Sequence, residues 1–382
     1  MTSKGICDPR FEGVRIAFEK NLAQDDIGAS VAVTVDGQFV VDLWGGYSDA
    51  ARTKLWEEDT ILNVFSSTKT MMALSVLVAA DRGEIALEAP VSQYWPEFAA
   101  NGKEDVQVKH FLSHTSGVSG WDVVIEEEDL YDWERATSLL AAQAPWWEPG
   151  TASGYHALNQ GYLVGEVMRR ATGRTMGTYF REEIAEPLGA DFHIGTDPRH
   201  FERIAELVAP ETEIAEMVEV EPGSVAARTL ASPRGFSGTE IIDWTRNEDW
   251  RSAEIGAGNG HGNARSMARV QTLLACGGTA FGRTLLSQAG CERVFEEQSN
   301  GLDLFLGLHM RFGMGYALHG SALDFGPQKR AHYWGGYGGS IVLVDQGARV
   351  CVTYAMNQLR ADQILGDHRS YALVDAVYAA LD

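Results

Sequence analysis

The apolar positions near the two ends of the chain follow the pattern of short antiparallel strands. Two hairpins are predicted, over residues 30–35 with 38–43 and over residues 340–344 with 349–354. Asp36-Gly37 supplies the positive φ angles that a tight turn needs in the first hairpin, and Asp345-Gln346-Gly347 takes the same place in the second. A further strand is predicted around residues 310–317, and a helix over residues 371–381 closes the chain.

Between these ends the apolar spacing is that of helices. Four are predicted, over residues 133–144, 156–171, 176–185 and 266–276. Gly173 and Pro187 are expected to end the second and third of them. Residues 210–258 are predicted to form a long loop, which is acidic at first. Because disordered segments are poor in aromatic residues, Trp244 and Trp250 indicate that this loop forms a wall of the cleft and is not disordered.

This arrangement predicts an α/β fold with an inserted helical part. The terminal segments are expected to share one antiparallel sheet flanked by helices, formed by residues 1–80 and 240–382. Residues 81–239 would form a mainly helical domain, with the active site in the cleft between the two. At 382 residues, 45% of them hydrophobic, the chain can bury a core of this size.

Charge and composition exclude several functions. Asp and Glu outnumber Lys and Arg by 53 to 31, a net charge of −22, whereas a nucleic-acid-binding surface needs clustered positive charge. No signal peptide or apolar run of membrane-spanning length is evident, so a cytoplasmic protein is expected. The four cysteines lack metal-type spacing and are expected to be free, buried thiols.

The clearest candidate for chemistry stands at the head of an apolar helix. Residues 70–80 are apolar nearly all round and end at Arg82-Gly83, which indicates a buried helix beginning at Ser66. A spacing of three places Ser66 and Lys69 on one face, and the helix N-terminus directs free N–H groups and positive charge at Ser66. A simpler reading makes Ser66 a helix cap and lets Lys69 reach solvent.

Other motifs argue against competing chemistries. No Gly-x-Ser-x-Gly elbow is present, which excludes the signature of the commonest esterase fold. His110 and His114 have the spacing of a metal pair, but no Glu follows His110 and no third ligand is indicated, so no metal is expected. Residues 256–262 (GAGNGHG) lack the spacing of a nucleotide loop and are interpreted as a mobile loop at the cleft, and no cofactor is expected.

Four segments together resemble the family VIII carboxylesterases, relatives of class C β-lactamases and DD-peptidases. They are residues 64–70 (VFSSTKT), 109–120 (KHFLSHTSGVSG), 148–168 (EPGTASGYHALNQGYLVGEVM) and 332–340 (HYWGGYGGS). Their order and separation are similar to those of the family from about residue 27 to residue 354. Ser-x-x-Lys is the nucleophile motif of the related enzymes.

The resemblance assigns roles to individual residues. It implies that Tyr155 is a catalytic residue beside Ser66 and Lys69, and that the backbone N–H groups of Ser66 and Tyr337 form the oxyanion hole. Ala157 stands where the relatives have an asparagine that contacts the substrate amide.

The third element, Trp334-Gly335-Gly336, departs from the Lys-Thr-Gly of β-lactamases. Its tryptophan replaces the lysine that attracts a substrate carboxylate there, so neutral esters are favoured over penicillin-like ligands. Trp334 is expected to form a flat apolar wall, and Gly335 and Gly336 to let substrate lie close to the backbone.

We therefore expect a serine carboxylesterase that hydrolyses small, short-acyl esters through an acyl-enzyme on Ser66. Lys69 and Tyr155 would share the serine proton; we expect burial to lower the pKa of Lys69 and the nearby ammonium to lower that of Tyr155. A β-lactamase- or DD-peptidase-like amide hydrolase, an acyltransferase, and an acylated sensor or inactive relative remain as alternatives. The expected partner is a small ester, not nucleic acid or a membrane, and the oligomeric state is open.

Overall fold

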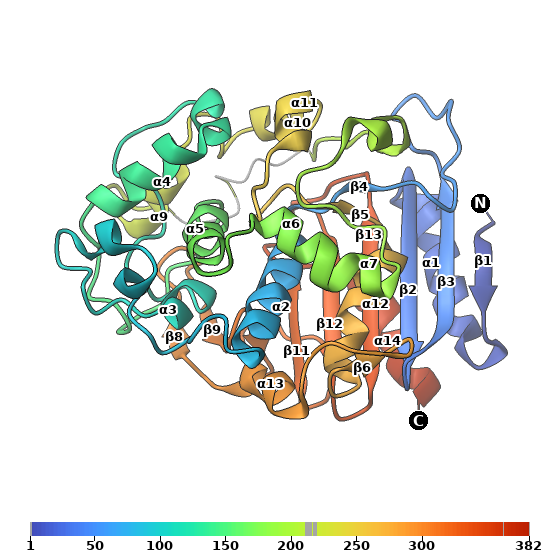
Figure 1. The fold of residues 1–382 in the computed structure, drawn as a ribbon. Coiled ribbons are helices and arrows are strands. Elements are labelled where there is room, and N and C mark those ends of the chain that lie inside the picture. Colours follow the sequence, from blue (N-terminus) through green and yellow to red (C-terminus); the bar gives the residue numbers. More distant parts are fainter. Residues whose placement is uncertain (1, 211–215, 217–219, 362, 382) are drawn as a thin grey trace.

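A single large antiparallel sheet forms the centre of the computed structural model, which describes residues 2–210, 216, 220–361 and 363–381 (Figure 1). Within those residues nine strands follow the order β1-β3-β2-β13-β12-β11-β10-β9-β8. The strands of this sheet are β1 Lys4–Cys7, β2 Gly28–Val35, β3 Gln38–Gly46, β8 Ser299–Leu302, β9 His309–Phe312, β10 Ala317–Leu318, β11 Ala331–Gly335, β12 Ile341–Asp345 and β13 Val350–Met356. Two short pairs lie outside it: β4 Leu62–Asn63 with β5 His261–Gly262, and β6 Thr279–Ala280 with β7 Arg283–Thr284.

Both predicted hairpins are present, and they meet at the centre of the sheet. Asp36 and Gly37 turn the chain between β2 and β3 with φ angles of 48° and 78°. β13 pairs antiparallel with β2, so the two ends of the chain share one sheet as expected. The strand predicted over residues 310–317 is instead two strands, because the chain turns at Gly315, where φ is 85°, and Ala317 pairs back onto Phe312.

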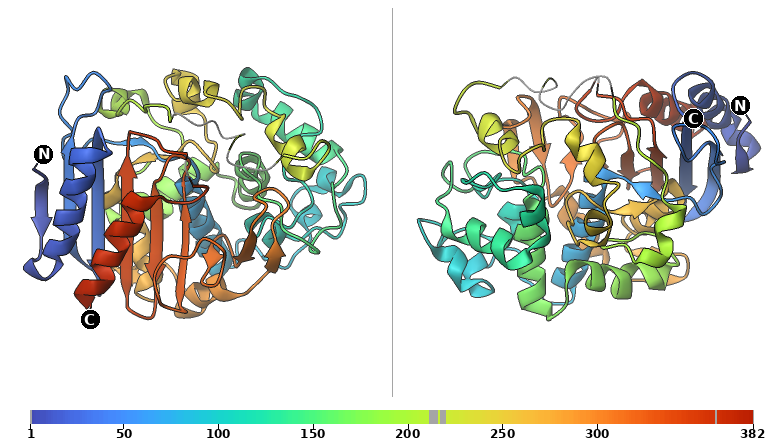
Figure 2. Two further views of the ribbon diagram at one scale, coloured as in Figure 1. Left: turned by 180° about the vertical axis from the view of Figure 1, so that it is seen from behind. Right: turned by 90° about the horizontal axis from the view of Figure 1, so that it is seen from above.

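Helices cover both faces of the sheet. Figure 2 shows α1 (Glu12–Gln24) and α14 (His368–Leu381) side by side on one face, and α12 (Ala264–Ala275) packs against β2, β12 and β13 on the other. Every residue of β13, and all but the last of β2, is buried. Both faces of these two strands are therefore covered, where a strict alternation of apolar and polar positions would have indicated one face in water.

The central helix α2 (Thr68–Asp81) joins the two parts of the molecule. On the side of the sheet it contacts α12 and α13 (Gln288–Glu292). On the helical side it contacts α5 (Gln160–Thr172) and α6 (Met176–Phe180). The helical part holds α3 Val108–Leu112, α4 Trp133–Ala142, α5 Gln160–Thr172, α6 Met176–Phe180, α7 Glu186–Leu188 and α9 Val225–Leu230 (Figure 1). The domain limits at residues 80 and 240 stay a prediction.

Two helix ends differ from the expectation. The helix predicted from residue 156 begins at Gln160, because residues 152–156 are irregular where the chain passes the candidate site. Pro187 does not end the third helix: a π-helical turn, Arg181–Ala185, leads without a break into α7, which contains Pro187. Gly189, with φ 62°, ends that helix instead.

The segment predicted as a long loop contains α9 and, after it, α10 (Glu240–Trp244) and α11 (Glu248–Ser252). Trp244 and Trp250 are both buried. Most of its acidic start, residues 211–215 and 217–219, lies outside the described residues.

Two further expectations concern the whole chain. All four cysteines are free thiols, three buried and Cys7 partly exposed. Across the described ranges, no helix combines the length and apolar character that crossing a bilayer requires. Location in the cytoplasm stays a prediction.

Candidate active site

The segment that carries Ser66 is a tight turn entering α2. Phe65–Ser67 form one 3-10 turn, and α2 continues from Thr68 without a break. Phe65 adopts φ 44°, a left-handed conformation that costs a non-glycine residue about 1–3 kcal/mol and is typical of functional sites. Ser66 therefore stands at the N-terminal end of a buried helix, as predicted.

Lys69 is buried with only 2% of its surface exposed, which excludes the reading in which it reaches solvent. Its Nζ donates hydrogen bonds to the backbone carbonyls of Ala157 and Ala257, each at 2.7 Å, and lies within hydrogen-bonding distance of Ser66 Oγ, at 3.0 Å. Burial lowers the pKa of Lys69 well below its usual value, as expected. Burial therefore favours the neutral amine beside Ser66.

Tyr155 reaches Ser66 from the loop before α5. Its hydroxyl donates to Ser66 Oγ at 2.7 Å and accepts a hydrogen bond from the indole N–H of Trp334 at 3.2 Å. Lys69 Nζ lies 4.8 Å from the centre of the Tyr155 ring. The expectation for the pKa of Tyr155 was wrong: burial raises it, because loss of solvent disfavours the phenolate and outweighs the hydrogen bonds that favour it.

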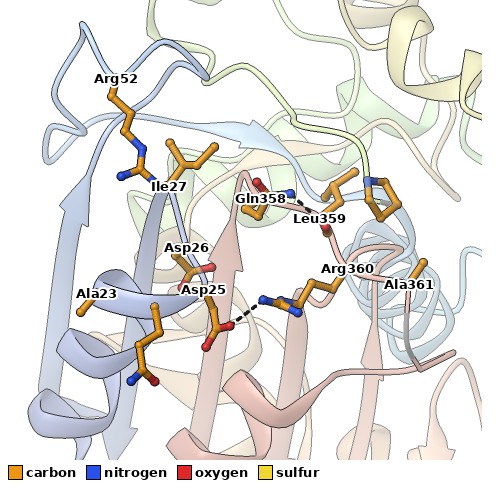
Figure 3. Close-up of a pocket in the computed structure, with 11 residues that line it drawn as sticks. Ala23, Asp25, Asp26, Ile27, Arg52, Gln358, Leu359, Arg360 and Ala361 are labelled. Atoms are coloured by element: carbon orange, nitrogen blue, oxygen red, sulfur yellow. Dashed lines mark hydrogen bonds and ion pairs between the residues drawn. The ribbon is translucent and has the colours of Figure 1, made fainter. Parts of the chain in front are cut away.

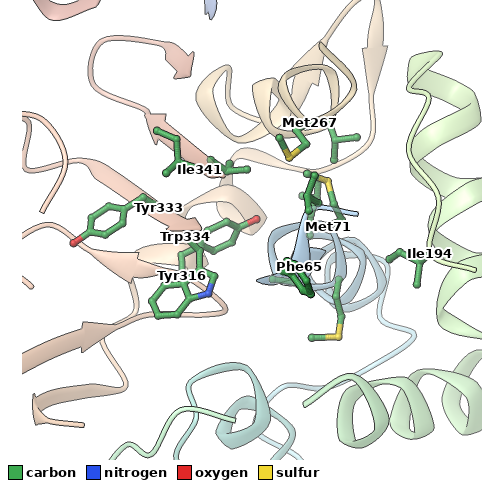
Figure 4. Packing of buried hydrophobic residues seen from close by; sticks show 14 of the residues in the cluster. Phe65, Met71, Ile194, Met267, Tyr316, Tyr333, Trp334 and Ile341 are labelled. Atoms are coloured by element: carbon green, nitrogen blue, oxygen red, sulfur yellow. The ribbon is translucent and has the colours of Figure 1, made fainter. Parts of the chain in front are cut away.

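Trp334 does more than form the predicted apolar wall. It lies on β11, buried, with its ring centre 5.1 Å from that of Tyr155. Figure 4 shows it on the sheet side together with Tyr316 and Ile341, opposite Phe65 on the helix side. Its N–H fixes the Tyr155 hydroxyl, a long-range contact that the motif alone did not predict.

Gly335 and Gly336 are required by the chain's own packing. A Cβ on Gly336 would lie 2.1 Å from the carbonyl oxygen of Val64, and one on Gly335 would lie 2.6 Å from that of Ser340. Gly335 also lines the cavity at Ser66, whereas contact of Gly336 with substrate stays a prediction. Tyr337 follows directly, lines the same cavity, and packs its ring 5.6 Å from that of Phe65.

The cavity above Ser66 is small and apolar, about 90 Å³ in volume. Its apolar lining comes mainly from Phe236, Ile241, Trp250, Phe305, Leu306 and Ile364. Ala157, at the position of the missing asparagine, lines it too. Of these walls the sequence analysis predicted Trp250, whereas Trp244, predicted together with it, is not among the described lining residues. A larger depression of about 470 Å³ lies elsewhere, around Asp25 and Arg360, and contains none of the candidate catalytic groups (Figure 3).

Asp303 is a site residue that the sequence analysis missed. Fully buried, it accepts through Oδ1 from the backbone N–H groups of Tyr155 at 3.1 Å and of Phe305 and Leu306 at 2.9 Å each. One oxygen thus joins the backbone of Tyr155 to a cavity wall. An aspartate that bonds N–H groups two and three residues ahead is a local turn signal, but nothing local indicates the contact with Tyr155.

His114, considered above as one of a possible metal pair, and residues 256–262, interpreted as a mobile loop, both pack around the candidate site. His114 Nδ1 accepts from the backbone N–H of His156 at 3.1 Å, and its ring packs 4.7 Å from that of Tyr155. Residues 256–262 are buried, and the Ala257 carbonyl among them holds Lys69. Among the residues described, no group of three or more potential ligands could hold a metal ion.

Comparison with known proteins shows the family of the chain. Residues 16–375 match the Beta-lactamase family. The chain belongs to the beta-lactamase family. It is 35% identical to the Esterase/beta-lactamase LipL of Mycobacterium tuberculosis (strain ATCC 25618 / H37Rv), over 96% of this chain and 86% of that protein.

Two solved structures extend the likeness within the beta-lactamase family. A family VIII carboxylesterase superposes with a TM-score of 0.91 at 39% identity over 100% of both chains. A penicillin-binding protein homologue from Caulobacter crescentus does so with a TM-score of 0.91 at 37% identity, also over 100% of both. The resemblance read from the four motifs is therefore confirmed, and the protein is a hydrolase of the beta-lactamase and esterase family.

Proposed function

We propose that this protein is a serine carboxylesterase that hydrolyses small, neutral, short-acyl esters through an acyl-enzyme on Ser66. One observation carries the proposal: Ser66 Oγ lies 3.0 Å from Lys69 Nζ and 2.7 Å from Tyr155 Oη at the edge of an apolar cavity. A hydroxyl between a buried amine and a phenol is arranged for nucleophilic attack.

Lys69 is the better base of the two. Its neutral amine has two N–H groups, and the carbonyls of Ala157 and Ala257 accept both, which directs the lone pair at Ser66 Oγ. Tyr155 has a raised pKa and keeps its proton, so its hydroxyl acts as a donor at the start of the reaction.

The reaction then proceeds in two steps, acylation of Ser66 and hydrolysis of the acyl-enzyme. The Ser66 proton passes to Lys69 as Oγ attacks the ester carbonyl, and the backbone N–H groups of Ser66 and Tyr337 stabilise the oxyanion. The bond to the alcohol breaks as the alcohol takes the proton back from Lys69, relayed by the Tyr155 hydroxyl. Water next gives its proton to Lys69 and attacks the acyl group, and Ser66 regains its proton as the acid leaves.

The cavity supports the choice of substrate. None of the described residues that line it is a Lys, Arg, Asp or Glu, so a charged acyl group would lose its hydration without gaining a counter-ion from them. A volume of about 90 Å³ suits a short acyl chain. Trp334 takes the place of the lysine that attracts the carboxylate of a penicillin-like ligand, so that attraction is lost here.

Ser66→Ala tests the proposal against p-nitrophenyl esters of increasing acyl length, with nitrocefin in parallel. We expect wild-type activity to be highest on short acyl chains and Ser66→Ala to lose it almost entirely. Ser75→Ala is the matched control, because Ser75 is a buried serine of the same helix whose hydroxyl bonds only the Met71 carbonyl. Wild-type rates in a folded Ser66→Ala protein would end the proposal, and a clear optimum at long chains would contradict the short-acyl preference.

A second candidate is β-lactam hydrolysis at the same site. The relative LipL is named an esterase/beta-lactamase, which favours this candidate, because one nucleophile and oxyanion hole can serve both reactions. Nitrocefin turnover faster than ester turnover, lost in Ser66→Ala, would put this candidate first.

A further inference from the structure

A buried ion cluster lies beneath the loop that carries Tyr337. Arg369, in the first turn of α14, has no exposed surface and lies between two buried carboxylates. Its Nη1 is 2.6 Å from Asp26 Oδ1 and its Nη2 is 2.5 Å from Asp367 Oδ2. Tyr354 donates to the other oxygen of Asp26 at 2.5 Å. The mechanism proposed above uses none of these groups.

The guanidinium of Arg369 also holds two backbone carbonyls. Nη1 donates to Gln358 O and Nη2 to Gly338 O, each at 2.8 Å, while Nε donates to Asp367. All five N–H groups of the arginine are therefore used. One of their acceptors, Gly338, immediately follows Tyr337 in the chain.

The glycine-rich loop of residues 336–339 packs directly against this cluster. A Cβ on Gly339 would lie 2.4 Å from Asp367 Oδ2 and 2.8 Å from Arg369 Nη2, so no side chain fits between the backbone and the ion pair. Gly338 adopts φ 91° and Gly339 φ 119°, conformations that glycine alone adopts readily. The far side of the cluster, at Asp26, underlies the surface depression of Figure 3.

The other side of the loop is held by the nucleophile segment. Gly336 packs against the Val64 carbonyl, which also accepts from Ser340 Oγ at 3.1 Å. The loop 336–339 thus spans from the backbone two residues before Ser66 to the ion cluster, and Tyr337 lies between the two anchors.

We propose that Arg369 is a positioning residue for the oxyanion hole: by fixing the Gly338 carbonyl, it sets where the Tyr337 N–H points relative to Ser66. This inference rests on the proposed function, because it assumes that the Tyr337 amide binds the oxyanion. Arginine suits the role, since only its planar fork binds two carboxylates and two carbonyls at once, and two buried carboxylates keep it charged.

Arg369→Lys and Asp367→Asn test the proposal from the two sides of the ion pair. The first keeps the positive charge but loses the fork, and the second weakens the support for both the loop and the arginine. Tyr354→Phe is the matched control, because it removes one hydrogen bond from the same cluster without contacting the loop. All three are compared with wild type at a temperature at which circular dichroism finds each folded.

The measurements are kcat and KM on p-nitrophenyl butyrate, and Ki for an alkyl trifluoromethyl ketone, whose carbonyl takes up Ser66 Oγ to form a tetrahedral oxyanion. Because loss of a whole oxyanion donor lowers kcat about 10²- to 10³-fold, a displaced one should lower it about tenfold or more. We expect that loss in both test variants with KM nearly unchanged, a matching rise in Ki, and little change in Tyr354→Phe.

Wild-type kcat and Ki in both folded test variants would overturn the inference. So would a loss of kcat in Tyr354→Phe as large as theirs, because that loss would reflect stability alone. Neither result touches the proposed function while Ser66→Ala stays inactive. Full activity in Ser66→Ala would instead remove the function on which the inference rests.

Discussion

Two lysines are buried in this molecule in similar surroundings, yet only one of them faces a group that can give it a proton. Lys69 and Lys103 are 2% and 1% exposed, and neither has a carboxylate within salt-bridge distance among the described residues. Lys103 donates to the carbonyls of Ala100 at 2.7 Å, Ala141 at 3.1 Å and Gln143. Lys69 donates to two carbonyls, and its third hydrogen-bonding partner is the hydroxyl of Ser66.

The comparison separates burial from catalysis. Burial lowers the pKa of both amines, that of Lys103 to about 8, so a lowered pKa alone does not mark a catalytic lysine. Lys103 donates to carbonyls at the C-terminal end of α4 and caps that helix. These carbonyls have no proton to give. The third partner of Lys69 is a hydroxyl in place of a carbonyl, and because a hydroxyl has a proton to give, Lys69 can act as a base.

The largest effect is expected at Lys69 itself. Lys69→Met fills a similar volume but leaves Ser66 without a base, so kcat/KM on p-nitrophenyl butyrate should fall about 10³-fold or more. The same substitution at Lys103 is the control. Equal losses in both variants would mean that burial of a lysine, and not its contact with Ser66, is what the activity needs.

Tyr155→Phe should have the next largest effect. The ring stays in the cavity wall while the hydroxyl that relays the proton to the departing alcohol is lost, so kcat should fall about 10²- to 10⁴-fold with KM little changed. Steady-state kinetics on p-nitrophenyl butyrate measures both constants. If kcat fell less than tenfold, Lys69 would serve as acid and base without the tyrosine.

A smaller loss is expected for Trp334→Phe. Phenylalanine keeps an aromatic wall but cannot donate the hydrogen bond that fixes the Tyr155 hydroxyl. Such a bond contributes about 0.5–1.5 kcal/mol, so kcat should fall roughly 2- to 10-fold. Comparison across the acyl-length series distinguishes the two roles of the residue: a changed chain-length preference at unchanged kcat would show that Trp334 acts as a wall only.

Lys103→Met should leave catalysis unchanged and affect stability. Three carbonyls lose their donor, which costs about 1–3 kcal/mol in the free energy of unfolding measured with urea. Because the pKa of Lys103 is about 8 when folded and near 10.4 when unfolded, the folded protein binds fewer protons between these values. Its contribution to stability therefore rises with pH across that window, and a variant with the same pH dependence as wild type would contradict this account.

The sequence could predict the parts of the fold and site that depend on local spacing. The turn at Asp36-Gly37, the buried helix after Ser66 and the spacing of Ser66 and Lys69 are all properties of neighbouring residues, and the structure confirms each. The position of Tyr155 beside them came from the resemblance of the four segments to a known family, and the structure brings it within hydrogen-bonding distance of Ser66.

The remainder depends on contacts between distant segments. The acceptors of Lys69 are backbone carbonyls, which every residue carries, so nothing in the sequence distinguishes Ala157 and Ala257. Lys103 and Lys69 likewise differ only in which segments fold around them. The rise in the pKa of Tyr155, opposite to the expectation, follows from burial that only the assembled cavity produces.

The most direct test of the central claim is to trap the acyl-enzyme. Wild-type protein mixed rapidly with p-nitrophenyl butyrate and quenched in acid should carry one butyryl group, and peptide mapping by mass spectrometry should locate it on Ser66. Lys69→Met should acylate far more slowly, whereas Lys103→Met should acylate at the wild-type rate. A butyryl group on another residue, or turnover that leaves Ser66 unmodified when quenched during the burst phase, would contradict the account.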